Sequence, residues 1–147
     1  MAYKANIRKR ILIKIIRDKE LALRWSEVEH MVSKALSHGT GDVTSFGLFK
    51  ECLEDISQCW VLENEDGIID GCSITRILQY ENHRELVIVT LTGKNIWASV
   101  GLGCLKLFEH FAKGVGCKYV SVYGRKGWSK LLPKEYKQPY QIFMKEI

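Results

Sequence analysis

The chain of 147 residues contains only two prolines and no apolar stretch of membrane-spanning length. The scarcity of proline argues against long disordered linkers, and without a long apolar run no spanning helix is predicted. The N-terminus begins like a signal peptide, but Lys14 interrupts its apolar stretch and no small-residue cleavage site follows. We therefore expect one domain over residues 1–147, of a size that buries an ordinary core.

Metal-binding, hydrolase and nucleotide-binding motifs are also missing. There is no C-x-x-C, no H-x-x-x-H and no carboxylate triplet at ligand spacing, so no metal site is predicted. Neither a G-x-S-x-G elbow nor a Walker loop occurs. The five cysteines lie far apart in mostly apolar surroundings, which indicates reduced core residues and a reducing, cytoplasmic compartment.

The net charge of +5 is unevenly distributed along the sequence. Residues 1–20 and 118–147 each hold seven Lys or Arg against two Asp or Glu, whereas residues 21–117 hold eight against thirteen. Two basic ends suit nucleic acid, an acidic partner or a polyphosphate cofactor, although a solvated basic edge explains the same charges. A nucleic-acid binder is therefore the weakest functional hypothesis, and it predicts steep salt dependence.

Apolar spacing predicts strands in the N-terminal and central parts of the chain and helices between them. Ile11, Ile13 and Ile15 alternate as in a strand, and the period then changes to that of a helix from Asp18, a candidate N-cap, to Gly39. A second helix is expected after Thr44 or Ser45. The further expected elements are strands 58–63, 68–78 and 86–92, a helix 104–115, a strand 117–123, a short helix 127–133 and a last strand 140–147.

Connection lengths suggest how these strands pair. The three central strands are joined by short polar turns, as in an antiparallel meander. The strand 117–123 follows a helix, so a parallel crossover is expected there. The sequence thus indicates an α/β (α+β) protein with a mixed, mostly antiparallel central sheet flanked by helices.

The order β-α-α-β-β-β-α-β-α-β resembles the GNAT fold of acetyl-coenzyme A (acetyl-CoA) dependent N-acetyltransferases. Members carry a Q/R-x-x-G-x-G/A motif after the fourth strand, which aligns here with residues 98–103. Both glycines are present, but Ala98 replaces the Gln or Arg. The resemblance implies acetyl-CoA as cofactor. The cofactor-binding residues that it implies are Ser99, Val100, Gly101, Leu102, Gly103 and Arg125.

The motif acts through its backbone. Free N–H groups at the start of a helix point toward the pyrophosphate, and glycine permits close approach. Backbone groups survive the loss of one side chain, so the replacement at Ala98 leaves this function intact. A plain turn before a helix is the alternative reading of the same glycines.

The second motif, after the fifth strand, departs further from the family. Members have an Asn, an Ala and a Tyr that protonates the departing thiolate, and the aligned residues here are Arg125, Trp128 and Leu132. Because leucine has no proton to give, Tyr123 or Tyr136 would have to serve as general acid. Arg125 with its neighbouring lysines can hold phosphate or simply be solvated.

Candidates for a catalytic base are scattered. Glu63, Glu85 and His83 are the candidates, but Glu85 and His83 lie in a polar turn before the fourth strand, where exposure favours a surface role. His38 lies in the loop between the first two helices, where the family binds its acceptor. The catalytic candidates are therefore Tyr123, Tyr136, Glu85 and His38.

Two functional classes follow from the resemblance. The first is an acetyltransferase that acts on an amine of a small molecule or a protein. The second is a catalytically inactive protein of GNAT shape that acts by binding a protein, as a virion or assembly component or an inhibitor of a host protein, with acetyl-CoA binding lost. The C-terminal pattern looks like divergent GNAT-like proteins encoded by bacteriophages, which places such a protein in the host cytoplasm or the virion.

Overall fold

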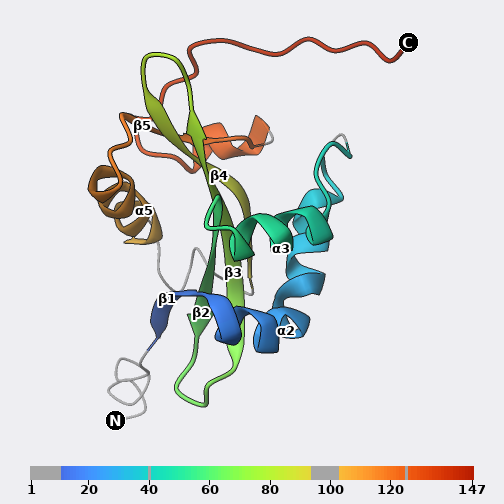
Figure 1. The fold of residues 1–147 in the computed structure, drawn as a ribbon. Coiled ribbons are helices and arrows are strands. Elements are labelled where there is room, and N and C mark those ends of the chain that lie inside the picture. Colours follow the sequence, from blue (N-terminus) through green and yellow to red (C-terminus); the bar gives the residue numbers. More distant parts are fainter. Residues whose placement is uncertain (1–10, 40, 94–102, 125) are drawn as a thin grey trace.

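A computed structural model describes residues 11–39, 41–93, 103–124 and 126–147 (Figure 1). It confirms the predicted fold class: one mixed sheet with helices on both faces. The elements in chain order are β1 (Leu12–Ile16), α2 (Asp18–Leu36), α3 (Ser45–Leu53), β2 (Ser57–Glu63), β3 (Ile69–Gln79), β4 (Arg84–Gly93), α5 (Gly103–Gly114), β5 (Tyr119–Val122) and the 3₁₀ helix η1 (Lys126–Lys130).

The sheet follows the chain, with spatial order β1-β2-β3-β4-β5. The first four strands pair antiparallel and β5 pairs parallel to β4, as the connection lengths predict. The turn between β2 and β3 is held by Asn64, whose Oδ1 accepts hydrogen bonds from the N–H groups of Asp66 and Ile68 at 2.9 and 3.0 Å. Gly67 in this turn has a φ of 78°, which glycine adopts without strain.

Alternation along the strands divides the core into two layers. On one face of the sheet, buried side chains such as Cys59 and Val61 pack with α2 and α3. On the other face Trp60 packs against Phe108 and Phe111 of α5. Figure 1 shows α2 and α3 on one side of the sheet and α5 on the other. We call these the α3 face and the α5 face.

The α5 face also contains a buried polar chain. The indole N–H of Trp60 donates to Thr75 Oγ1 at 2.9 Å, and the Thr75 hydroxyl donates to Gln58 Oε1 at 2.8 Å. Each of these polar groups thereby has a hydrogen-bond partner in the interior, where an unpaired polar group is costly. This chain holds the indole of Trp60 in the orientation that meets α5.

A side-chain cap explains where α3 begins but not where α2 begins. The Thr44 side chain accepts a hydrogen bond from Gly47 N–H at 3.0 Å, so Thr44 is the cap of α3, and Ser45, the other predicted candidate, is its first residue. The expectation for α2 is wrong: Asp18 is the first helical residue, and the N-cap position belongs to Arg17, without a side-chain hydrogen bond. Asp18 instead places a carboxylate in the first turn, where the helix dipole favours negative charge.

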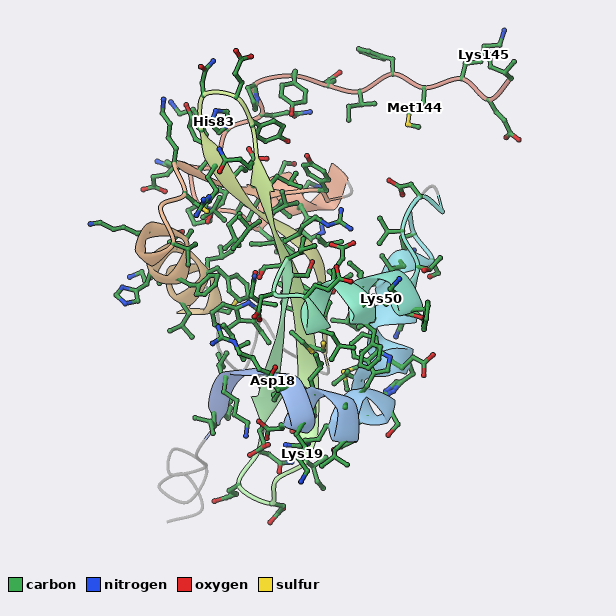
Figure 2. All side chains as sticks on the ribbon, in the orientation of Figure 1. Asp18, Lys19, Lys50, His83, Met144 and Lys145 are labelled. Atoms are coloured by element: carbon green, nitrogen blue, oxygen red, sulfur yellow. The ribbon has the colours of Figure 1, made fainter. Side chains whose placement is uncertain are left out.

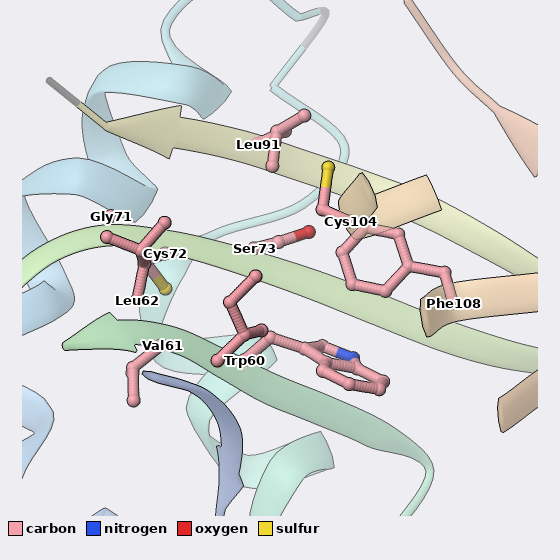
Figure 3. A pocket seen from close by; sticks show the side chains of 10 residues that line it. Trp60, Val61, Leu62, Gly71, Cys72, Ser73, Leu91, Cys104 and Phe108 are labelled. Carbon is pink, nitrogen blue, oxygen red and sulfur yellow. The ribbon is translucent and has the colours of Figure 1, made fainter. Parts of the chain in front are cut away.

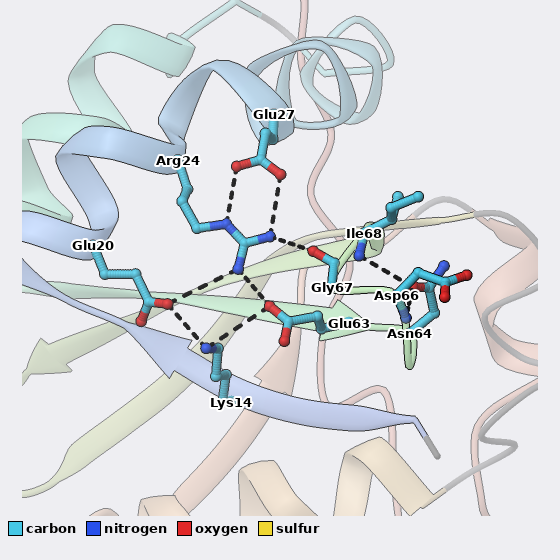
Figure 4. Close-up of polar contacts among 9 residues, drawn as sticks. All are labelled: Lys14, Glu20, Arg24, Glu27, Glu63, Asn64, Asp66, Gly67 and Ile68. Carbon is cyan, nitrogen blue, oxygen red and sulfur yellow. Dashed lines mark hydrogen bonds and ion pairs between the residues drawn. The ribbon is translucent and has the colours of Figure 1, made fainter. Parts of the chain in front are cut away.

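An ion-pair network ties the start of α2 to the sheet (Figure 4). The Arg24 guanidinium contacts Glu27 and Glu63 and donates to the carbonyl oxygen of Gly67 at 2.8 Å. Lys14 Nζ of β1 lies 2.9 Å from Glu20 Oε2. The Glu27 and Glu63 carboxylates raise the pKa of Arg24, and the same contact lowers the pKa of Glu27. Glu63, a candidate base by sequence, is thus engaged in linking β1, α2 and β2.

The predicted last strand is wrong. Residues 140–147 pair with no strand in the part of the chain that the structure describes, and they extend away from the body (Figure 1). Their alternation satisfies the local requirement for a strand. A strand also needs a neighbour to take its backbone hydrogen bonds, and the fold brings none to this segment.

Candidate functional site

The strands β4 and β5 separate part of the way along their length. β5 pairs with β4 from Glu85 to Ile88, whereas β4 continues to Gly93. The register between β3 and β4 shifts at this point: Ile74 pairs with Thr90 and Thr75 with Ile88, which leaves Val89 as an extra residue. A bulge of this kind bends and twists a strand and disrupts its pairing.

We call the point after Ile88, where β5 ends and β4 continues alone, the fork. The fork leaves backbone groups of β4 without a strand partner. Among the described residues, none pairs with the β5 side of β4 from Val89 to Gly93. An N–H group there can donate to an oxygen that gains negative charge, as in acyl transfer. The fork is therefore the place on the sheet where an extended ligand can meet free main-chain donors.

The N-terminus of α5 lies beside the fork. Gly103 is the first residue of α5, and Cys104 and Phe108 of the same helix line one small pocket together with Leu91 of β4 and Ser73 of β3 (Figure 3). The first turns of α5 thus lie over the C-terminal half of β4. Free N–H groups and the helix dipole make a helix N-terminus favourable for phosphate. Residues 98–102 of the predicted motif, and Arg125, lie outside the described residues.

The pocket beneath α5 is too small for a ligand. Its volume is about 10 Å³, and its walls are mainly apolar, with Trp60 on one side and Cys104 on the other. A single water molecule needs at least about 10–15 Å³ and polar partners. The pocket is therefore a packing gap in the core, and ligand chemistry belongs to the fork.

Aromatic residues gather on the α3 face along the paired parts of β4 and β5, and Tyr123 lies at the end where these strands separate. The tyrosine cluster consists of Tyr80, His83, Glu85, Tyr119 and Tyr123. The ring of His83 lies 5.1 Å from the rings of both Tyr80 and Tyr119, measured between centroids. The Tyr80 hydroxyl lies 3.5 Å from Glu85 Oε2. Pairing of β3 with β4 and of β4 with β5 brings these residues together from three strands and their ends.

The cluster changes the acidity of Tyr123. Tyr123 is 60% exposed, yet the partial burial of its hydroxyl raises its pKa to about 12, and the Tyr80 hydroxyl and the Glu85 charge act in the same direction, against Arg76. Arg76 is itself held by Glu51 of α3 in two hydrogen bonds of 2.8 and 2.9 Å. Tyr123 is therefore protonated at neutral pH, and its hydroxyl can donate a proton or a hydrogen bond.

Tyr123 and Glu85 differ in their distance from the fork. Tyr123 directly follows the last residue of β5, where the strands separate. Glu85 precedes Ile88 by three residues, which is about 10 Å along a strand. Tyr80 contacts both residues: its hydroxyl lies 3.5 Å from Glu85 Oε2, and it also raises the pKa of Tyr123.

Tyr136 and His38 lie apart from this cluster. Tyr136 packs on the α5 face, and its hydroxyl donates to Glu109 Oε2 of α5 at 2.7 Å. Burial and this contact raise the pKa of Tyr136. His38 is exposed beyond the C-terminal end of α2, and no hydrogen bond or ring contact joins it to the cluster in the described ranges.

Leu132, which aligns with the family's proton donor, has a packing role in the structure. It is partly buried against the core of the α5 face, together with Tyr136. Tyr123, which follows β5, is thus the described candidate for proton donation at the fork. Sequence reasoning missed Tyr80, because only the β3–β4 hairpin brings this residue, in a polar turn, back toward β5.

Other kinds of site are not seen in the described residues. Across residues 11–39, 41–93, 103–124 and 126–147, no three Asp, Glu, His or Cys side chains gather as metal ligands. In the same ranges no helix is long and apolar enough to cross a membrane. All five cysteines are free thiols and four are buried, as their apolar surroundings predict.

Comparison with known proteins places the fold among acetyltransferases. No family model and no curated sequence matches the chain. An aminoglycoside acetyltransferase from an uncultured soil sample, solved with sisomicin, is similar in structure, with a TM-score of 0.68, 14% identity and coverage of 93% of this chain and 97% of that one. A GNAT family acetyltransferase of Staphylococcus aureus gives a TM-score of 0.63, 15% identity and coverage of 93% and 98%.

A third similar structure was solved with a cofactor. It is a predicted acetyltransferase of Clostridium acetobutylicum in complex with acetyl-CoA, with a TM-score of 0.69, 11% identity and coverage of 94% of this chain and 96% of that one. At such identities the likeness establishes the fold. The chain has the GNAT fold over nearly its whole length.

Proposed function

We propose that this protein is an acetyl-CoA dependent N-acetyltransferase that acts on a small-molecule amine. The observation that carries the proposal is the fork: free main-chain groups of β4 lie beside the N-terminus of α5. A thioester oxygen suits the free N–H groups, and a pyrophosphate suits the helix N-terminus. The similar structure with acetyl-CoA supports the cofactor, and the one with sisomicin supports an amine acceptor.

The residues of this chain then have distinct tasks. Acetyl-CoA supplies an acyl carbon at which the amine forms a C–N bond while the C–S bond breaks. Backbone N–H groups between Val89 and Gly93 hold the carbonyl oxygen. Tyr123 would donate its proton to the leaving sulfur and regain one from water, and the amine would release its proton to water. Glu85 is a positioning residue, because its carboxylate contacts the Tyr80 hydroxyl and its charge raises the pKa of Tyr123.

The first experiment measures binding of acetyl-CoA to the intact protein by calorimetry and by thermal shift. A ligand at a hundredfold excess over its Kd stabilises the folded state by about 2.7 kcal/mol, so a clear rise in melting temperature is expected. Desulfo-coenzyme A tests whether the nucleotide and pantetheine suffice for binding. An unchanged melting temperature with each ligand, together with no calorimetric heat, would contradict the proposal.

A second prediction concerns turnover. Tyr123→Phe is expected to lower kcat about a hundredfold, because general acid catalysis contributes roughly 10²–10⁴. Affinity for acetyl-CoA should stay within about twofold, since a hydroxyl at the sulfur is used in the transition state. Steady-state kinetics with an amine panel gives kcat, and calorimetry gives the affinity.

Tyr119→Phe is the matched control, because Tyr119 belongs to the same cluster but precedes the fork by the length of β5. Its kcat should remain near that of the unaltered protein. With a pKa of about 12, Tyr123 should also cause no loss of kcat as pH rises from neutral toward the ordinary tyrosine range. Equal kcat values for Tyr123→Phe and Tyr119→Phe would remove Tyr123 from the mechanism.

A second candidate function is binding without catalysis, as in the phage-encoded proteins that the C-terminal sequence resembles. The observation that favours it is Leu132, which occupies the aligned position of the family's proton donor and packs into the α5 face. This candidate predicts no acetyl transfer to any amine of the panel. Transfer to one amine at a rate well above the uncatalysed reaction would exclude it.

A further inference from the structure

The tyrosine cluster combines aromatic rings with one carboxylate and is open to solvent. The exposed fractions of its tyrosines are 42% for Tyr80, 50% for Tyr119 and 60% for Tyr123. Figure 2 shows His83 near the tip of the β3–β4 hairpin, away from α2 and α3. Exposed rings that lie together in this way mark a binding surface. A ligand can therefore approach β5 and the fork from the face that α5 does not cover.

Glu85 supplies the negative charge of this surface. Its carboxylate lies 3.5 Å from the Tyr80 hydroxyl, and none of the ion pairs between described residues includes it. Arg76, a cation on the same face, already bonds to both carboxylate oxygens of a glutamate in α3. Arg84 is directed toward the end of α5, where it donates to the carbonyl oxygen of Val115 at 2.7 Å. A positively charged ligand group would thus gain a partner at Glu85.

The rings beside Glu85 favour an ammonium group in particular. The face of an aromatic ring attracts a cation that lies within about 6 Å of its centroid. The ammonium group of the chain's own Lys118 lies 5.4 Å from the centroid of the Tyr119 ring, so these ring faces are accessible to such a group. A carboxylate among aromatic rings is the combination that recognises an alkylammonium ion.

A buried hydroxyl between two of the tyrosines also points to a ligand. Ser121 lies between Tyr119 and Tyr123 on β5, and alternation along the strand gives the three side chains the same face. Its Oγ is buried and has no hydrogen-bond partner among the described residues. An unpaired buried polar atom is costly and is usually satisfied by water or another bound group. A polar ligand that enters between the rings would remove this cost.

The spacing along β4 sets the length of the ligand. Glu85 precedes Ile88, the last residue of β4 that pairs with β5, by three residues, which is about 10 Å along a strand. In the proposed acetyl transfer the attacking nitrogen lies at the fork. A second nitrogen of the same molecule therefore reaches Glu85 only if the two nitrogens are about 10 Å apart.

From the placement of this carboxylate, the exposed rings and the fork on one face, we propose that the acceptor is a linear diamine whose second nitrogen binds as an ammonium group at the tyrosine cluster. The inference rests on the proposed acetyltransferase function and names the acceptor class. The neutral nitrogen at the fork forms the C–N bond while the C–S bond breaks, and its proton passes to water. The far ammonium group keeps its proton and contributes to binding alone.

The test compares straight-chain α,ω-diamines, from propanediamine to dodecanediamine, with the primary monoamines of the same carbon chains in steady-state kinetics. A diamine whose nitrogens span about 10 Å should have a KM about tenfold lower than its monoamine, because an ion pair and a cation–π contact act together. Propanediamine is too short to reach Glu85 and should show no preference. Transfer with equal KM values across the series would overturn the inference and leave the acetyltransferase proposal intact.

Glu85→Gln should remove the preference for the long diamine. A change in kcat that arises through Tyr123 would affect both amines alike, so it cancels in the ratio of their kcat/KM values. Glu81→Gln is the matched control, because Glu81 is exposed in the turn of the same hairpin, and this variant should retain the preference. Equal ratios for the two variants would overturn the inference.

Binding of the amines without acetyl-CoA separates the two proposals. Calorimetry should show that the long diamine binds more tightly than its monoamine to the unaltered protein, and that Glu85→Gln abolishes the difference. If this difference is found but no amine is acetylated, the acetyltransferase proposal fails and the cation site stands. No preference for the diamine in binding would overturn the cation site. Thermal unfolding without ligand should be alike for the unaltered protein and both variants, since neither glutamate belongs to an ion pair of the described residues.

Discussion

Gly103→Val is expected to weaken binding of acetyl-CoA by about tenfold or more, which corresponds to about 1.4 kcal/mol or more. Gly103 begins α5, and no described atom lies within 4 Å of a Cβ built there, so the protein itself tolerates the side chain. A pyrophosphate that approaches the helix N-terminus would meet the added methyl groups. Alanine is compatible with the motif, so valine is the informative substitution.

Gly114→Val is the matched control for this prediction. Gly114 ends the same helix and also has no described atom within 4 Å of a built Cβ. Both substitutions replace an exposed glycine at an end of α5, so their effects on the stability of the helix should be similar. Calorimetry should show lower affinity for Gly103→Val alone. Equal affinities for the two variants would place the cofactor elsewhere, if the unaltered protein binds it.

The largest effect on stability is expected for Phe108→Ala, which should lower the free energy of unfolding by about 3–5 kcal/mol. Phe108 is 1% exposed, and its ring lies 4.9 Å from that of Trp60 at an angle of 69°, an edge-to-face contact. The substitution leaves a cavity between α5 and the sheet that the rigid strand β2 cannot close. Urea unfolding followed by circular dichroism measures the loss.

Leu107→Ala provides the comparison, because Leu107 precedes Phe108 on α5 but is 41% exposed. Truncation of this side chain should change the free energy of unfolding by less than about 1 kcal/mol. Similar losses for the two variants would mean that α5 does not pack on the sheet through Phe108. Because α5 carries the proposed phosphate site, Phe108→Ala should also weaken the binding of acetyl-CoA.

The secondary structure was predictable where the pattern is local. Thr44 caps α3 as expected, because a cap depends on a side chain and a backbone N–H three residues apart. The glycine that starts α5 and the parallel placement of β5 also follow from the sequence, through motif and connection length. The strand predicted at 140–147 failed for the opposite reason: its alternation is local, but its partner is not.

The site residues were likewise predictable only in part. Tyr123 and Glu85 were recognisable as titratable groups near the expected cleft, whereas Tyr136 and His38 were equally plausible from sequence alone. Only the strand pairing shows that Tyr123 and Glu85 share a cluster with Tyr80, while Tyr136 bonds to Glu109 on the other face. The raised pKa of Tyr123 could not be inferred, because it arises from burial and from neighbours far away in the sequence.

By itself, the sequence determined the order of helices and strands as far as β5, the two apolar faces of the sheet and the glycine at the start of α5, because each depends on spacing along one segment. The tertiary structure alone decided where β4 and β5 part, which tyrosine lies at the fork and which strand is left without a partner. These features arise from register and contact between distant segments, and side-chain periodicity carries no information about register between strands.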